Sequence, residues 1–275
     1  MSRYQGKALA DVRREPRAGS PFRRPLRIVL AMLVLGGLAM VPWKDVRRAL
    51  LVVDHIKVTG IRYLDEARVR ERSKLVVGQD LVALDLVRAR QLVLLEPRLR
   101  SAEVRRHGLR GVEIRVVERV PVLTVEHGEP WEIDEDGVLL EPLQPGVVAD
   151  VPMLVGPDFS KHRSGTLIQT TAVKRGLAWR AILNHNTLRL AGQVSEVDVS
   201  NPHLTRLVLM DGVRVVAPSW PNGERQLSGM RATLADLKLK GKMPREVDVR
   251  FKDQIVVRGA RDVSPTLPEK TSRKS

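Results

Sequence analysis

Residues 54–59 read DHIKVT and residues 112–118 read VEIRVVE, and both stretches alternate apolar with polar side chains. Such alternation is typical of strands that bury one face. We expect Ile56 and Val58 to point into a core from the first strand, and Ile114 to do so from the second.

Two helical segments lie between these strands. In the first segment, one face of the helix carries Leu64, Ala67 and Val69. The second ends before Pro97 and is expected to turn inward Leu84, Val87, Leu92 and Leu95. A strand around residues 102–104 and a turn-prone run at 107–111 then lead into the strand at 112–118. The order β-α-α-β-β predicts two helices on one face of a three-stranded sheet.

This order, with the IKVTG strand, the VGQDL turn and the EVRRH…VEIRVVERVPV hairpin, resembles a POTRA domain, here residues 51–121. The segments that follow resemble the FtsQ/DivIB family in the same order, through WEIDEDGVLLE, VPMLVG, VSEVDVS, LVLMDGVRVVA and EVDVRFKDQIVVR. The resemblance runs from Pro25 to Arg258. One departure is Pro97-Arg98-Leu99, where many members carry an aromatic residue after the proline.

Residues 122–258 are predicted to form a second, β-rich α/β domain. A helical stripe is expected to include Leu167, Val173, Leu177, Ala181 and Ile182. Asp211-Gly212 is a turn pair between two strands. A second helix at 224–239 turns inward Leu227, Met230, Leu234 and Leu237. The domain ends at 246–258 in a strand pair or one bulged strand.

An uncharged run of sixteen residues, from Ile28 to Trp43, contains the stretch VLAMLVLGGLAMVPW. The run predicts a transmembrane helix at 26–43 that stays attached, because Leu38-Ala39-Met40-Val41 followed by Pro42 is a poor cleavage site for a signal peptide. Residues 1–27 carry eight Lys or Arg against two acids, which predicts a cytoplasmic N-terminus and an exported remainder. The fold class is therefore α+β, with one transmembrane helix before the two domains.

The amino-acid composition excludes some classes of site and disfavours others. The chain of 275 residues has no cysteine, which excludes disulfides and thiolate sites, and its net charge is +15. The basic residues alternate with apolar ones and only nine residues are aromatic, so a solvated basic face is favoured over nucleic-acid binding. The segments 1–25 and 259–275 are polar or proline-bearing and are predicted to be disordered.

No motif in the sequence indicates catalysis, a cofactor or a metal. In EIDEDGVLLE, Glu132, Asp134, Asp136 and Gly137 occupy the first positions of a calcium loop, but Leu143 stands where the final acid is required. An acidic β-turn with Asp136-Gly137 as its turn pair is the favoured interpretation. The six histidines show no metal-ligand spacing, and phosphate-loop and nucleophile motifs are absent.

The resemblance implies a non-enzymatic scaffold of the division machinery in the inner membrane at the septum, which binds FtsB- and FtsL-like partners and regulates septal peptidoglycan synthesis by other proteins. In the family the terminal strand accepts a partner strand, which here assigns the site to Phe251, Lys252, Asp253, Gln254, Ile255, Val256 and Val257. Strand addition uses outward N–H groups, so one of Val256 and Val257 should supply the outward donor. The alternatives are a POTRA-bearing envelope chaperone or secretion component and a membrane-anchored wall hydrolase.

Overall fold

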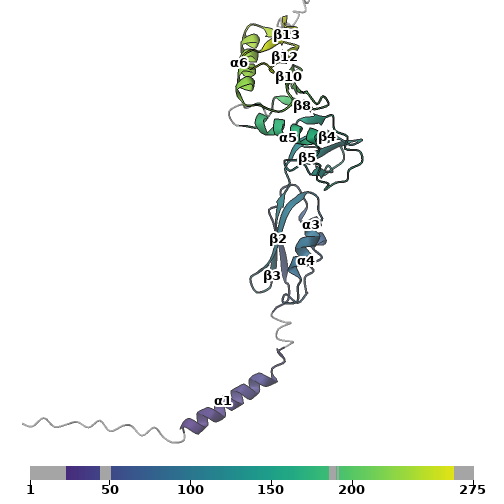
Figure 1. Cartoon of the computed structure of the whole chain (residues 1–275). Helices are drawn as coiled ribbons and strands as arrows, with labels where there is room; N and C mark the ends of the chain where they lie inside the picture. The colour runs from purple at the N-terminus through teal and green to yellow at the C-terminus, as the bar shows by residue number, and fades with distance from the viewer. Residues whose placement is uncertain (1–22, 44–50, 186–189, 191, 263–275) are drawn as a thin grey trace, which may run out of the picture. The chain divides into compact units, whose positions relative to one another are not determined.

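The computed structural model describes residues 23–43, 51–185, 190 and 192–262. The chain divides into two units, Met1–Val52 and Val53–Ser275. In the first unit, helix α1 covers Arg23–Met40, three residues earlier than predicted (Figure 1). Pro25 is tolerated there because the first N–H groups of a helix have no partner within the helix. The predicted disorder of residues 1–25 is therefore wrong for residues 23–25, and residues 1–22 lie outside the described part of the chain.

Helix α1 is the structure's counterpart of the transmembrane helix expected at 26–43. Its apolar side chains are exposed, for example Leu35 and Met40. Across the described ranges, no helix combines the length with the apolar character that membrane crossing demands.

The second unit begins with a small three-stranded sheet whose strand order is β1-β3-β2. Its strands are β1 His55–Thr59, β2 Leu99–His107 and β3 Gly111–Glu118. Helices α3 Glu66–Ser73 and α4 Leu86–Val93 lie on the same side of it (Figure 1). The predicted order β-α-α-β-β is confirmed, and the central strand β3 pairs in parallel with β1 and antiparallel with β2.

The apolar alternation of the small sheet is confirmed. Val58 and Ile114 are partners in register, and Ile114 is completely buried. Val69 and Leu64 join the same core, as predicted, whereas Ala67 is exposed. Val116 is buried as well, so β3 buries one face along its whole length.

The predicted inward face of the second helix is confirmed at Leu84, which packs against the core, and is wrong at Val87 and Leu95. Val87 and Leu95 are 66% and 64% exposed, and the buried positions of α4 are Ala89 and Val93. The segment has apolar residues on more than one face, so periodicity alone could not choose between them. Packing against the sheet decides which face of the helix is buried, and the sheet accommodates the small Ala89 side chain.

The remainder of the second unit forms a nine-stranded mixed sheet, in the order β13-β12-β10-β9-β8-β7-β4-β5-β6. The strands are β4 Pro121–Glu126, β5 Pro130–Asp134, β6 Leu139–Leu140, β7 Met153–Val155, β8 Val194–Asp198, β9 Leu204–Leu209, β10 Arg214–Pro218, β12 Glu246–Asp248 and β13 Val256–Arg258. The predicted hairpin around Asp211-Gly212 joins β9 to β10. The final segment is a strand pair rather than one bulged strand.

Helices α5 Thr171–Leu183 and α6 Arg225–Leu239 pack on the large sheet. In α6, Leu227 and Met230 are buried as predicted. In the predicted stripe of α5, Val173 is buried, whereas Leu167 precedes the helix and is exposed, as is Ala181. The buried face instead contains Trp179, whose indole N–H donates to the Ser219 carbonyl at 3.1 Å.

The predicted disorder after Gly259 is wrong for the next few residues. Strand β14, Arg261–Asp262, pairs antiparallel with β11, Lys242–Met243. A two-residue strand with one basic and one acidic side chain has no apolar alternation, so its sequence carries no signal of a strand. Residues 263–275 lie outside the described part of the chain.

Candidate functional site

Strand β13 lies at one edge of the large sheet (Figure 1). On its outer side, no strand of the described residues pairs with it. The opposite edge strand, β6, is covered, because the Leu139 N–H donates to the Thr166 carbonyl at 2.9 Å and Val138 bridges to Leu167. Unpaired backbone groups on an edge can pair with another chain. We therefore take β13 as the candidate site.

The direction of the backbone groups along β12 follows from its bonds to β10. The Val249 N–H donates to the Val216 carbonyl at 2.9 Å, and the Arg245 carbonyl accepts from the Arg214 N–H at 3.1 Å. Backbone groups alternate sides from one strand residue to the next. The groups of Val247 therefore face β10 as well, and those of its two neighbours face β13.

Those two neighbours are Glu246 and Asp248, which stand in register with Arg258 and Val256. The two hydrogen-bonded pairs of the β12–β13 ladder are thus at its ends. The middle residue, Val257, turns its N–H and C=O away from β12 and toward the free edge. Of the two valines between which the sequence could not decide, Val257 carries the outward donor.

The chain forms another short strand pair after β13. The register that pairs Glu246 with Arg258 is kept three residues further on, where Met243 pairs with Arg261 in β11 and β14. Between them Gly259 has a φ of +64°, and a Cβ there would stand 3.2 Å from the Arg245 Cβ. β11 and β14 form a separate two-stranded sheet, so the edge strand of the large sheet is Val256–Arg258, which overlaps the predicted segment 251–257 at Val256 and Val257.

The structure divides the predicted segment between a loop and a strand. Phe251, Lys252, Asp253 and Gln254 are exposed in the loop that joins β12 to β13, and Phe251 is 47% exposed. Ile255 packs against the large core. Only Val256 and Val257 of the seven belong to the edge strand. In the loop, the Arg250 guanidinium lies 6.0 Å from the centroid of the Phe251 ring.

The acidic hairpin between β5 and β6 is a turn, as favoured from the sequence. Its central residues are Glu135 and Asp136, one position earlier than predicted, and the Gly137 N–H closes it on the Asp134 carbonyl at 3.1 Å. Gly137 has a φ of +91°, which favours glycine. In the described part of the chain, no group of three or more potential ligand residues could hold a metal ion.

Arginine side chains form salt bridges with the carboxylates of this hairpin. Arg98 binds Glu132 at 2.5 Å, and both side chains are almost fully buried. Arg119 binds Asp134 at 2.5 Å, and the second Asp134 oxygen accepts from the Val138 N–H at 2.8 Å. Buried carboxylates require such partners. The acids therefore stabilise the junction between β3 and the large sheet.

Two family models cover most of the described second unit. Residues 51–119 match "POTRA domain, FtsQ-type", and residues 122–261 match "Cell division protein FtsQ/DivIB, C-terminal". The second match alone covers more than half of the chain and ends inside β14. The chain belongs to the FtsQ/DivIB family of cell-division proteins.

Several curated members of the FtsQ/DivIB family are similar to the chain. "Cell division protein FtsQ" of Streptomyces coelicolor is 29% identical over 244 residues, which cover 82% of this chain and 88% of that protein. The protein of the same name from Myxococcus fulvus is 27% identical over 190 residues, 69% of this chain and 66% of that protein. The one from Streptomyces collinus is 36% identical over 126 residues, 44% of this chain and 46% of that protein.

In this FtsQ/DivIB chain, a buried carboxylate holds the loop that leads to the edge strand. Asp248 is completely buried and accepts hydrogen bonds from the Arg250 backbone N–H at 3.1 Å and from its guanidinium at 2.9 and 2.7 Å. The guanidinium bonds are the main reason that the pKa of Asp248 lies below its ordinary value.

Asp248→Asn is expected to lower the free energy of unfolding by about 1 kcal/mol, because a charge-assisted pair becomes a neutral one while the half-exposed Arg250 regains water. Since the folded pKa of Asp248 is lowered, its contribution is complete above the ordinary aspartate pKa of about 3.9 and is lost as the pH falls further. Urea unfolding of both proteins between pH 7 and pH 3 measures this difference. A difference that grows on acidification would contradict the assignment.

Proposed function

We propose that this chain is a non-enzymatic scaffold of the division machinery that captures a partner by strand addition at β13. The observation that carries the proposal is the free edge of β13, on a C-terminal domain of the FtsQ/DivIB type. Family membership implies work in a protein assembly, and a free edge offers backbone donors and acceptors to an incoming strand. The partners we propose are FtsB- and FtsL-like proteins.

Side chains around the edge suit a partner strand that carries both apolar and charged side chains. Val256 and Val257 are half-buried, and Phe251 is exposed in the loop that precedes the strand. Arg258 is exposed and binds Glu246 at 3.1 Å. Charges at intervals protect an edge from unspecific pairing, while the apolar residues between them reward a specific strand. Regulation of septal peptidoglycan synthesis would then act through the captured partners.

Attachment to the inner membrane is part of the proposal. The uncharged run from Ile28 to Trp43 and the eight basic residues within 1–27 support an N-terminal anchor with a cytoplasmic N-terminus. The exposed apolar side chains of α1 support it as well, because water disfavours a contiguous apolar surface of that kind. The two folded domains would then lie on the outer side of the membrane, where the septum is built.

A fluorescent protein that is active outside the cytoplasm, fused after the last residue of the full chain, tests location and topology together. We expect fluorescence concentrated at midcell and recovery of the fusion with the membrane fraction. An even distribution round the envelope contradicts the division role. A soluble exported product lacking the first ~40 residues, the length of a signal-peptide region, contradicts the anchor while leaving the role in division open.

A further inference from the structure

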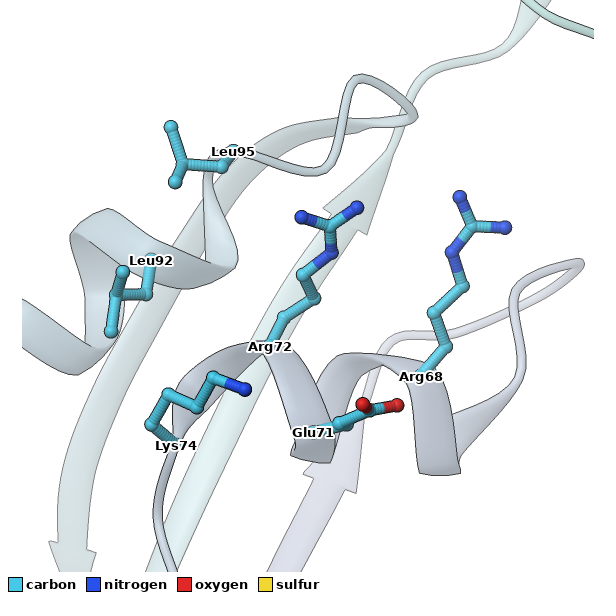
Figure 2. Close-up of a pocket in the computed structure, with 6 residues that line it drawn as sticks. All are labelled: Arg68, Glu71, Arg72, Lys74, Leu92 and Leu95. Atoms are coloured by element: carbon cyan, nitrogen blue, oxygen red, sulfur yellow. The ribbon is translucent and has the colours of Figure 1, made fainter.

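A basic groove lies between α3 and α4, on the helical side of the small sheet. Figure 2 shows Arg68 and Arg72 extending the same way from α3, with Leu92 and Leu95 on the facing wall. The groove has a volume of about 400 Å³, and Glu71 and Lys74 complete its lining. Three cations and one anion leave this lining with a net charge of +2.

A buried carboxylate, that of Glu96, holds the two arginines of the groove in place. The Glu96 side chain is buried and binds Arg68 Nε at 2.9 Å, while Arg72 Nε stands 3.9 Å from the same oxygen. One carboxylate thus faces two guanidinium groups, which leaves hydrogen-bond donors over for a ligand. A guanidinium fixed by one carboxylate loses less side-chain entropy when it binds a second.

The backbone conformation of Lys74 is a second unusual feature of the groove. It is the one non-glycine residue with positive φ in the described parts of the chain, at +56°, and it ends α3. Glycine is the usual residue there because a side chain strains this conformation. Lys74 forms no salt bridge with any residue that the structure describes, so no carboxylate among those residues accounts for a lysine at this strained position. Strain of this kind concentrates at functional positions.

We propose that this groove binds an acidic amphipathic helix of a partner protein. Arg68 and Arg72 are four residues apart on α3, so they match carboxylates three or four residues apart on a facing helix. Leu92 and the exposed Leu95 offer an apolar contact to leucines on the adjacent face of that helix. The groove is a second interaction surface, distinct from the edge of β13, and the proposal does not depend on strand addition there.

The test uses the full chain in nanodiscs of neutral phosphatidylcholine. The probe is a fluorescein-labelled helical peptide with leucines on one face and glutamates at i and i+4 beside them. Its control has glutamine for every glutamate. Fluorescence anisotropy should show binding of the acidic peptide that weakens with salt, and no binding of the neutral one. No binding of the acidic peptide, or equal binding of the two, overturns the proposal.

Three variants locate the binding. Lys74→Gly should weaken binding about tenfold, the value of one charge-assisted contact, while its melting temperature stays equal or rises because the strain is relieved. Leu95→Gln should also weaken binding, and it changes only an exposed residue. Lys57→Gln, at an exposed position of β1, removes one positive charge as Lys74→Gly does, and this matched control should bind as the unaltered chain does. A Lys74→Gly chain that binds normally overturns the proposal.

A soluble short-chain phosphatidylglycerol serves as a competing probe. Displacement of the peptide only at high lipid concentration supports a protein ligand. If the lipid instead binds tightly, loses affinity on Lys74→Gly, and excludes the peptide, the groove is a lipid-headgroup site and the proposal is overturned.

Discussion

A chain carrying Val257→Pro is expected to fold and to lose its partner strand. The Val257 N–H points away from β12, so proline removes no hydrogen bond within the sheet, and edge strands tolerate proline. The proline, however, offers no N–H donor to an incoming strand, and its ring stands where that strand would pair. Leaving one acceptor unpaired costs about 1–3 kcal/mol, and the ring prevents close approach, so capture should weaken by about a hundredfold.

Val256→Pro, one residue earlier, is the matched control. Its N–H faces Asp248 within the β12–β13 ladder, so proline there breaks the sheet itself and should destabilise the domain. Co-purification of an FtsB-like partner with the tagged full chain measures capture, and circular dichroism with thermal unfolding measures the fold. If both variants fold and retain the partner, the interface lies elsewhere, and the edges of the small sheet are the next candidates.

Ile114→Asp is expected to unfold the small-sheet domain. Ile114 is completely buried on the central strand, between its register partners Val58 and Val104. A carboxylate in this apolar core has no partner among the core residues, and several kcal/mol is comparable to the stability of a whole small domain. Loss of one cooperative transition in urea unfolding of the full chain, or of its tertiary-structure signal, would report this.

Arg115→Asp provides the contrast for Ile114→Asp. Arg115 is the next residue of β3 and points to the open face of the sheet, where its side chain is about half exposed and stands 3.6 Å from Glu113. An aspartate there stays hydrated, so the domain should remain folded with at most a modest loss of stability. Equal unfolding of the two variants, or a normal transition for Ile114→Asp, would mean that the inward face of β3 is assigned to the wrong residues.

The strands of the small sheet could be predicted because each of them buries one face only. A period of two leaves a single choice, and Ile56, Val58 and Ile114 all face the core as expected. The same reasoning failed for α4. There Leu86, Val87, Leu92 and Leu95 are all apolar, and the helix turned Ala89 and Val93 to the sheet instead. The half-buried Leu92 and the exposed Leu95 line the groove beside α3.

The order of the elements, the positions of most strands and the family could be predicted without a structure, because these depend on local periodicity and on motifs in succession. The three-dimensional arrangement was needed to show that β13 is a free edge, that Val257 rather than Val256 faces outward, and that Arg261 pairs with Met243 in a separate short sheet. Each of these depends on which strand lies alongside which, and on the register between them. Register is set by contacts between residues far apart in the chain, such as Val247 with Val215 on one side and Val257 on the other, and no local pattern contains it.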